Sequence, residues 1–221
     1  MPNSLSEIFS MLPQAAWETL FMTFASTFFA CLLGFPLGVY LFVTSPAGLA
    51  PRQLVYNLLS RVVNLFRSFP FIILMILLMP LSRLLIHTSI GPIAVIIPLS
   101  ICAAPFVSRV VESALQEVES GCLLAARAMG STNWQIISKV LIPEALPALV
   151  AGLALTIITI IGYSAMAGAI GGGGLGDLAI RFGYYRFRTD ITIAAVIVIL
   201  VFVELVQLGG TLISRNLLAK R

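Results

Sequence analysis

The sequence predicts an all-α polytopic membrane protein with five transmembrane helices. The first observation is composition: 59% of the 221 residues are hydrophobic, 10% are charged, and the mean hydropathy is +1.05. Soluble domains carry about 25% charged residues, so a chain this apolar needs lipid as its solvent. The second observation is that several charge-free intervals exceed the roughly 20 residues that a helix needs to cross the hydrocarbon of a bilayer.

The same composition excludes several classes of function. The chain has a single histidine, which leaves little room for histidine metal sites or histidine-activated nucleophiles. Its 13 basic residues stand mostly at the ends of apolar runs, as membrane anchors do, and form no basic face for nucleic acid. The three cysteines, an odd number without CxxC spacing, imply no disulfide framework: Cys31, Cys102 and Cys122.

The charge-free intervals place the spans in order. Residues 19–51, 84–108 and 145–176 carry no charge, and residues 191–214 carry only Glu204. A further apolar run, from Val55 to Leu85, is interrupted by Arg61 and Arg67. It is long enough to cross the membrane only if Arg67 enters the membrane from one end. We therefore expect one transmembrane domain over residues 1–221, with a loop at 112–142 and spans at 17–44, 57–83, 89–111, 144–170 and 190–214.

An odd number of spans puts the two termini on opposite sides of the membrane. With the amino terminus outside, nine cations lie at the cytoplasmic side: Arg52, Arg61, Arg67, Arg109, Arg127, Lys139, Arg215, Lys220 and Arg221. Four lie outside: Arg83, Arg181, Arg186 and Arg188. Because cytoplasmic loops carry the excess of lysine and arginine, we expect a cytoplasmic carboxyl terminus in a bacterial inner membrane. Residues 1–17 contain no lysine or arginine, so no cleaved signal is expected.

The loop at 112–142 is predicted to be a pair of short amphipathic helices. An apolar stripe at helical spacing marks the first helix, and Gly130 is placed to end it in a left-handed conformation. Ser131 or Thr132 can cap the second helix, and Pro143 with Glu144 suits the first turn of the next span. The stripes contain Leu115, Val118, Cys122, Ala126 and Met129, then Trp134, Ile137, Val140 and Leu141. Such a hairpin either rests on the bilayer or, given its small residues, docks onto a partner protein.

The segment LAARAMGSTNWQIISKVLIP resembles the EAA loop of ABC importer permeases. Its Ala125, Ala126, Gly130 and Pro143 match that motif, whereas Leu124 replaces the motif's glutamate. Beyond the loop, VVNLFRSFPFIIL, SRVVESAL and GYSAMAGAIGGGGLGDLAIRFGY resemble the permeases of methionine importers. This resemblance implies a homodimer with one central path, two copies of a separate ATPase that bind ATP and Mg, and a methionine-binding protein or lipoprotein outside. The residues expected to couple to the ATPase are Ala125, Ala126, Gly130, Ser131, Trp134, Ile142 and Pro143.

Four membrane residues are candidates for the translocation path or its gate: Arg67, Tyr163, Ser164 and Met166. An arginine at membrane depth is costly unless it is paired or hydrated, so Arg67 either faces the path or extends to the headgroups. In the path its partner is either Glu204 or the carbonyls freed where Pro70 kinks the helix. Met166 lies among small residues and could close the path against its dimer mate, although it could equally be plain packing. The cluster at 181–190 suits headgroups or an acidic docking surface.

The function predicted is that of a permease subunit working by alternating access, with ATP hydrolysed elsewhere. The glycine-rich GGGGLGD segment lacks the lysine and hydroxyl of a phosphate-binding loop, so no cofactor is expected on this chain. The alternatives are an ion-coupled secondary amino-acid carrier or channel without an ATPase, and a scaffold subunit. A carrier would need more ionisable residues near the midplane than Arg67 and Glu204 provide. Methionine as the solute rests on the resemblance alone.

Overall fold

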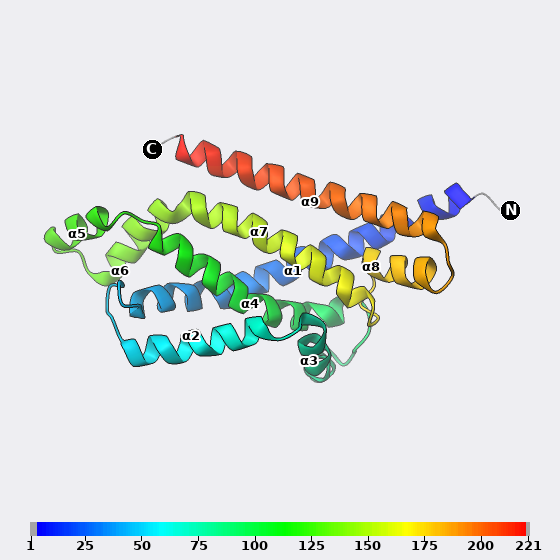
Figure 1. The fold of residues 1–221 in the computed structure, drawn as a ribbon, viewed down its shortest axis with the longest axis horizontal. Helices are drawn as coiled ribbons and strands as arrows, with labels where there is room; N and C mark the ends of the chain where they lie inside the picture. Colours follow the sequence, from blue (N-terminus) through cyan, green and yellow to red (C-terminus); the bar gives the residue numbers. More distant parts are fainter. Residues whose placement is uncertain (1–3, 220–221) are drawn as a thin grey trace.

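A computed structural model describes residues 4–219 as a bundle of long helices (Figure 1). No strand occurs within these residues, which confirms the all-α class. The elements in chain order are α1 (Ser4–Thr44), α2 (Gln53–Ser68), α3 (Phe71–Ile86), α4 (Pro92–Gln116), α5 (Ser120–Ala128), α6 (Asn133–Ile136), the π-helical segment η1 (Ile137–Leu141), α7 (Ile142–Gly168), α8 (Gly174–Leu178), the π-helical segment η2 (Ala179–Tyr184) and α9 (Thr189–Leu218).

Different elements lie at the two ends of the bundle. The start of α1 and the short helix α8 lie at one end, whereas α5, α6 and the end of α9 lie at the other (Figure 1). Hence the two described ends of the chain lie at opposite ends of the bundle, as an odd number of crossings requires. Two of the cations used to orient the chain, Lys220 and Arg221, lie outside the described residues.

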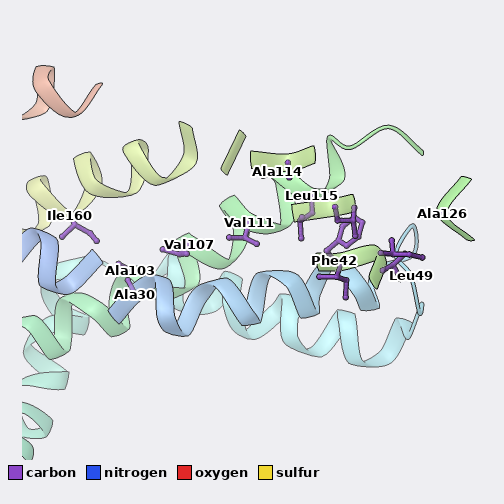
Figure 2. Close-up of a cluster of buried hydrophobic side chains, with 14 residues drawn as sticks. Ala30, Phe42, Leu49, Ala103, Val107, Val111, Ala114, Leu115, Ala126 and Ile160 are labelled. Carbon is purple, nitrogen blue, oxygen red and sulfur yellow. The ribbon is translucent and has the colours of Figure 1, made fainter. Parts of the chain in front are cut away.

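Helices α1 and α4 form the centre of the bundle. Helix α4 is the most buried of the membrane-length helices, and two glycines four residues apart, Gly34 and Gly38, allow α1 to approach its backbone closely. Along this contact a core runs toward α5 (Figure 2). Its members include Ala30, Phe42, Ala103, Val107, Val111, Ala114, Leu115, Ala126 and Ile160. The loop helices α5 and α6 are therefore joined to the membrane bundle by one continuous core.

The second expected span is not one straight helix. Four helices are long and apolar enough to cross a membrane: Ser10–Thr44, Pro92–Gln116, Asn133–Gly168 and Thr189–Leu218. The stretch predicted at 57–83 instead consists of α2 and α3, which meet at 102° and give a fifth crossing if they count as one broken span. Pro70 explains the break, because its ring disfavours a helical conformation at Phe69, which is extended with ψ of 135°.

The third span is longer than expected and takes residues from the predicted loop. Helix α4 continues to Gln116, so Leu115 packs in the bundle core and the expected amphipathic helix starts only at Ser120. Glu112, the first residue of the predicted loop, lies inside this helix and is 3% exposed. The side chain of Arg109 lies one turn away and forms an ion pair with it at 2.6 Å, which allows the helix to continue past both charges.

The second loop helix does not end before the fourth span. Helix α6, η1 and α7 form one helical stretch from Asn133 to Gly168, so the expected start of the span near Glu144 falls inside it. The π-helical turns at Ile137–Leu141 come immediately before Pro143, where a proline amide could donate no hydrogen bond. The loop is thus rigidly continuous with the span that follows.

Candidate functional site

The hairpin between α5 and α6 is built by the local signals that the sequence displays. Gly130 has φ of +79° and follows α5, as expected for a left-handed helix end. Thr132, and not Ser131, caps α6: its hydroxyl accepts from the Gln135 amide at 3.4 Å, and the Gln135 side chain accepts from the Thr132 amide at 2.8 Å. Both helix ends are therefore fixed without help from a partner.

The hairpin presents large apolar side chains at the end of the bundle. Leu124 is 65% exposed, Met129 78% and Trp134 74%. The sequence analysis placed Met129 and Trp134 on apolar stripes, and the bundle core takes from these helices only Ala126 of α5 and Ile136, Ile137 and Leu141 of the next helical stretch. We call Leu124, Met129 and Trp134 the hairpin surface.

The other expected coupling residues are divided between this surface and the interior. Ala125 is exposed, Ser131 and Ile142 are half-buried, and Pro143 is exposed on α7. Arg127 fastens α5 to the bundle by donating to the Leu49 carbonyl at 3.0 Å. Beside α5, a groove of about 640 Å³ opens between the loop after α1 and the start of α5. Leu124 in the position of the motif's glutamate was the sequence signal for this apolar surface.

A second site lies at the bend between α2 and α3. The Phe71 ring stacks on the Tyr163 ring with centroids 4.0 Å apart and planes at 7°, and the Arg67 guanidinium lies 6.0 Å from the centre of the Phe106 ring. Arg67 and Tyr163 thus line one cavity, as two of the four path candidates should. The aromatic residues around them were not singled out from the sequence.

The remaining path candidates point in different directions. Met166 is 50% exposed and lies three positions after Tyr163, so the two share a face of α7. Ser164 is buried and donates to the Ile161 carbonyl of its own helix at 2.8 Å, so the structure does not bring it to that face. Among the described residues, Arg67 forms no ion pair with Glu204, the partner considered for it above.

A buried polar network that the sequence analysis missed holds α2 against α4. Arg109 donates from Nη1 to the Glu112 carboxylate at 2.6 Å. From Nη2 it donates to the Ser60 carbonyl and to the Asn64 side chain, both at 3.0 Å, and also to the Ser60 hydroxyl. Arg109 and Glu112 stand three residues apart, the spacing at which helical charges pair, and this was the available signal. The network therefore holds α2 against α4 in the turns just before Arg67.

The glycine-rich segment turns tightly at the opposite end of the bundle. Gly173 and Gly174 have φ of +80° and +76°, and α1 satisfies the amides that follow: Glu18 accepts from Gly174 and Thr19 from Leu175, both at 2.8 Å. The segment is therefore a structural connection, with positive φ angles as expected. Within residues 4–219, no three histidine, cysteine or carboxylate side chains gather into a metal site.

The arginines of the neighbouring cluster at 181–190 have partners close to them in the chain. Arg181 forms an ion pair with Asp177 at 2.7 Å and Arg188 one with Asp190 at 2.8 Å, while Arg186 lies over the Phe182 ring at 4.6 Å. Its aromatic side chains point outward, since Tyr184, Tyr185 and Phe187 are more than two thirds exposed. His87, 1 residue beyond α3, is exposed and caps that helix with φ of +63°.

A bundle of membrane-length helices that is continuous with an exposed helical hairpin defines the membrane subunit of a transporter. The chain belongs to the family of binding-protein-dependent transport system inner membrane components, whose profile matches residues 34–218. This membership confirms the resemblance and the location in the inner membrane. It also weighs against the ion-coupled carrier.

Relatives named as methionine transport permeases match between 72% and 94% of this chain. The probable D-methionine transport system permease protein MetI of Haemophilus influenzae is 44% identical over 209 residues, 94% of this chain and 98% of the relative. The D-methionine transport system permease protein MetI of Escherichia coli is 50% identical over 158 residues, 72% of this chain and 73% of the relative.

Solved structures agree with the fold. A chain from the inward-facing MetNI methionine ABC transporter has a TM-score of 0.93 at 43% identity and covers 98% of this chain and 99% of its own. An amino acid ABC transporter solved with histidines has a TM-score of 0.67 at 19% identity, which shows a shared fold alone.

Proposed function

We propose that this chain is the permease subunit of an ATP-driven methionine importer. The observation that carries the proposal is the match to a methionine ABC transporter chain across 98% of this sequence, at 43% identity and a TM-score of 0.93. Identity at this level extends to D-methionine permeases over almost their full length. The chain itself is a translocation subunit, and ATP with Mg is bound and hydrolysed by a separate ATPase.

The assembly follows from this assignment. Two copies of the chain form one central path, two ATPase subunits sit on the cytoplasmic side, and a methionine-binding protein or lipoprotein docks outside. The hairpin surface is the ATPase contact, because large apolar side chains exposed to water at the end of a bundle mark a protein interface. Helix continuity from α6 through α7 then carries movement of the ATPase to Met166 without a flexible joint.

A pair of tryptophans allows a matched test of this contact. Trp134 is 74% exposed on the hairpin, and Trp17 is 69% exposed on α1, the helix that starts at the opposite end of the bundle (Figure 1). Trp134→Ala should lower co-purification of the ATPase about fivefold or more, as truncation of a buried interface tryptophan does, whereas Trp17→Ala should not. Equal recovery of the ATPase with both variants would contradict docking at the hairpin.

Uptake assays test the importer itself. The chain, its ATPase and its binding protein in proteoliposomes should accumulate radiolabelled methionine only with ATP and Mg. Accumulation that follows an ion gradient without ATP would instead establish the carrier.

The gate and the orientation are further parts of the proposal. Met166, half exposed on the same face of α7 as Tyr163, meets its dimer mate and closes the path by apolar contact. Arg67 faces the path, and Ser164 supports the helix from behind.

The amino terminus lies outside, in line with the distribution of the cations. In a variant without native cysteines, Tyr184→Cys should react with an impermeant thiol reagent from outside. Met129→Cys should react only after permeabilisation, and the reverse pattern would overturn the orientation.

A further inference from the structure

A small cavity at the bend between α2 and α3 combines one cation with several aromatic rings. It has a volume of about 150 Å³, and its walls include Phe66, Arg67, Phe69, Phe71, Phe106 and Tyr163. At about 30 Å³ of liquid volume per water, this is room for roughly five waters or for part of an amino acid. The cavity is therefore the size of a subsite for a small solute.

Two hydrogen-bond donors line this cavity without an acceptor. Among the described residues, Arg67 has no carboxylate or carbonyl partner, and its recorded contact is the face of the Phe106 ring. Among the same described residues the Tyr163 hydroxyl has no hydrogen-bond partner, and the Tyr163 ring stacks on Phe71. A guanidinium with five N–H donors and a phenol that share one cavity match an anion that offers several acceptor oxygens.

The rest of the lining is suited to an apolar side chain. Phe106 presents its ring to the Arg67 guanidinium, and Phe66 and Cys102 add a second ring and a thiol to the wall. Aromatic rings attract a thioether sulfur, usually at the ring edge, and also accept aliphatic groups. A carboxylate on Arg67 and Tyr163 thus places an unbranched apolar side chain against aromatic walls.

We propose that this cavity is a substrate subsite of the permease, in which Arg67 and Tyr163 bind the α-carboxylate of an apolar amino acid in transit. The inference rests on the proposed function, which makes an amino acid the solute. Tyr163 and Met166 are one helical turn apart on the same face of α7, about 4.5 Å along its axis. The subsite therefore lies next to the gate, where it would receive a solute just admitted or about to leave.

A ligand that lacks the carboxylate tests whether the cavity recognises that group. The complete transporter in nanodiscs, without its binding protein, is equilibrated with radiolabelled L-methionine or with methioninol, whose carboxylate is replaced by an alcohol. The wild type should bind methionine at least about tenfold more tightly than methioninol, because charge-assisted hydrogen bonds are the stronger ones. Arg67→Gln should remove this preference, because it should weaken the binding of methionine about tenfold and change the binding of methioninol little.

Matched variants separate recognition from folding. Arg61→Gln removes an exposed arginine from the same helix, away from the cavity, and should retain the preference. Tyr163→Phe keeps the ring that stacks on Phe71 and should reduce the preference by less than Arg67→Gln does. If Arg67→Gln fails to co-purify with the ATPase, Arg67→Lys, which keeps the charge without the fork, should show a partial loss instead.

Each remaining outcome decides the proposal. Absence of methionine binding to the wild-type transporter, or an unchanged preference in Arg67→Gln and Arg67→Lys, overturns the subsite. Equal weakening of methionine and methioninol overturns it as well, and is the result expected if Arg67 holds a lipid phosphate. These results leave the importer intact as long as ATP-driven methionine uptake persists in the wild type, whereas loss of that uptake refutes the proposed function.

Discussion

Adding a single methyl group at Gly34 or Gly38 tests the close contact of α1 with α4. A Cβ at Gly34 would lie 2.5 Å from the Ala104 carbonyl oxygen and 2.7 Å from the Val107 Cβ, and Gly38 repeats these distances with Ser108 and Val111. Ordinary contacts of this kind begin at 3.4 Å. Since rigid backbone blocks the new atom at both sites, the two helices must separate by roughly 1 Å.

The expected cost follows from two opposing effects. Overpacking a tight contact costs about 1–3 kcal/mol. Replacing glycine by alanine in a helix otherwise gains up to about 1 kcal/mol. Gly34→Ala and Gly38→Ala should therefore each destabilise the protein by about 1–2 kcal/mol, and the double variant by less than the sum because both act on one interface.

Thermal unfolding of the purified protein in detergent measures the effect, at about 2–4 °C per kcal/mol for a chain of this size. Gly209→Ala on α9 is the control, because its Cβ would meet nothing within 4 Å, and it should be neutral or slightly stabilising. If Gly34→Ala and Gly209→Ala shift the midpoint in the same direction by similar amounts, the close contact would not be limiting.

Three other substitutions test the remaining features. Gly130→Val should impair ATP-coupled uptake, since the left-handed backbone costs a β-branched residue more than about 1–2 kcal/mol, whereas Gly130→Asn should retain most uptake; equal activity of the two would contradict this. Arg109→Ala leaves a buried carboxylate unpaired and should cost about 3–5 kcal/mol in thermal unfolding, part of which removal of Glu112 as well should restore. Thr19→Val leaves the Leu175 amide without its acceptor and should speed its hydrogen exchange, at a cost of about 1–3 kcal/mol, while an unchanged rate would show that the contact is not needed.

Local signals in the sequence predicted the helix ends with good accuracy. Gly130 ends α5 in the left-handed conformation, and the capping residue of α6 is one of the two expected. These features depend on bonds between residues close in the chain, so their geometry follows from the residue types. The presence of membrane-length helices was predicted from hydropathy, because the thickness of the bilayer sets the length of apolar helix that can cross it.

The sequence did not reveal which apolar residues are buried. Trp134 and Ile137 share an apolar stripe, yet Trp134 is 74% exposed and Ile137 is buried. Periodicity identifies a face of a helix, but only the neighbouring helices decide which part of that face is covered. The burial of Glu112 could not be read from the sequence either, since its ion-pair partner Arg109 also donates to Ser60 of α2, 49 residues earlier in the chain.

The sequence by itself determined the solvent of this protein, its helical class and the hairpin with its caps, because hydropathy and capping act over short stretches of chain. Only the tertiary structure decided the gathering of Arg67 and Tyr163 around one cavity and the exposure of the hairpin surface. Each of these depends on how distant helices pack, and packing is a property of surfaces that meet only in the folded bundle.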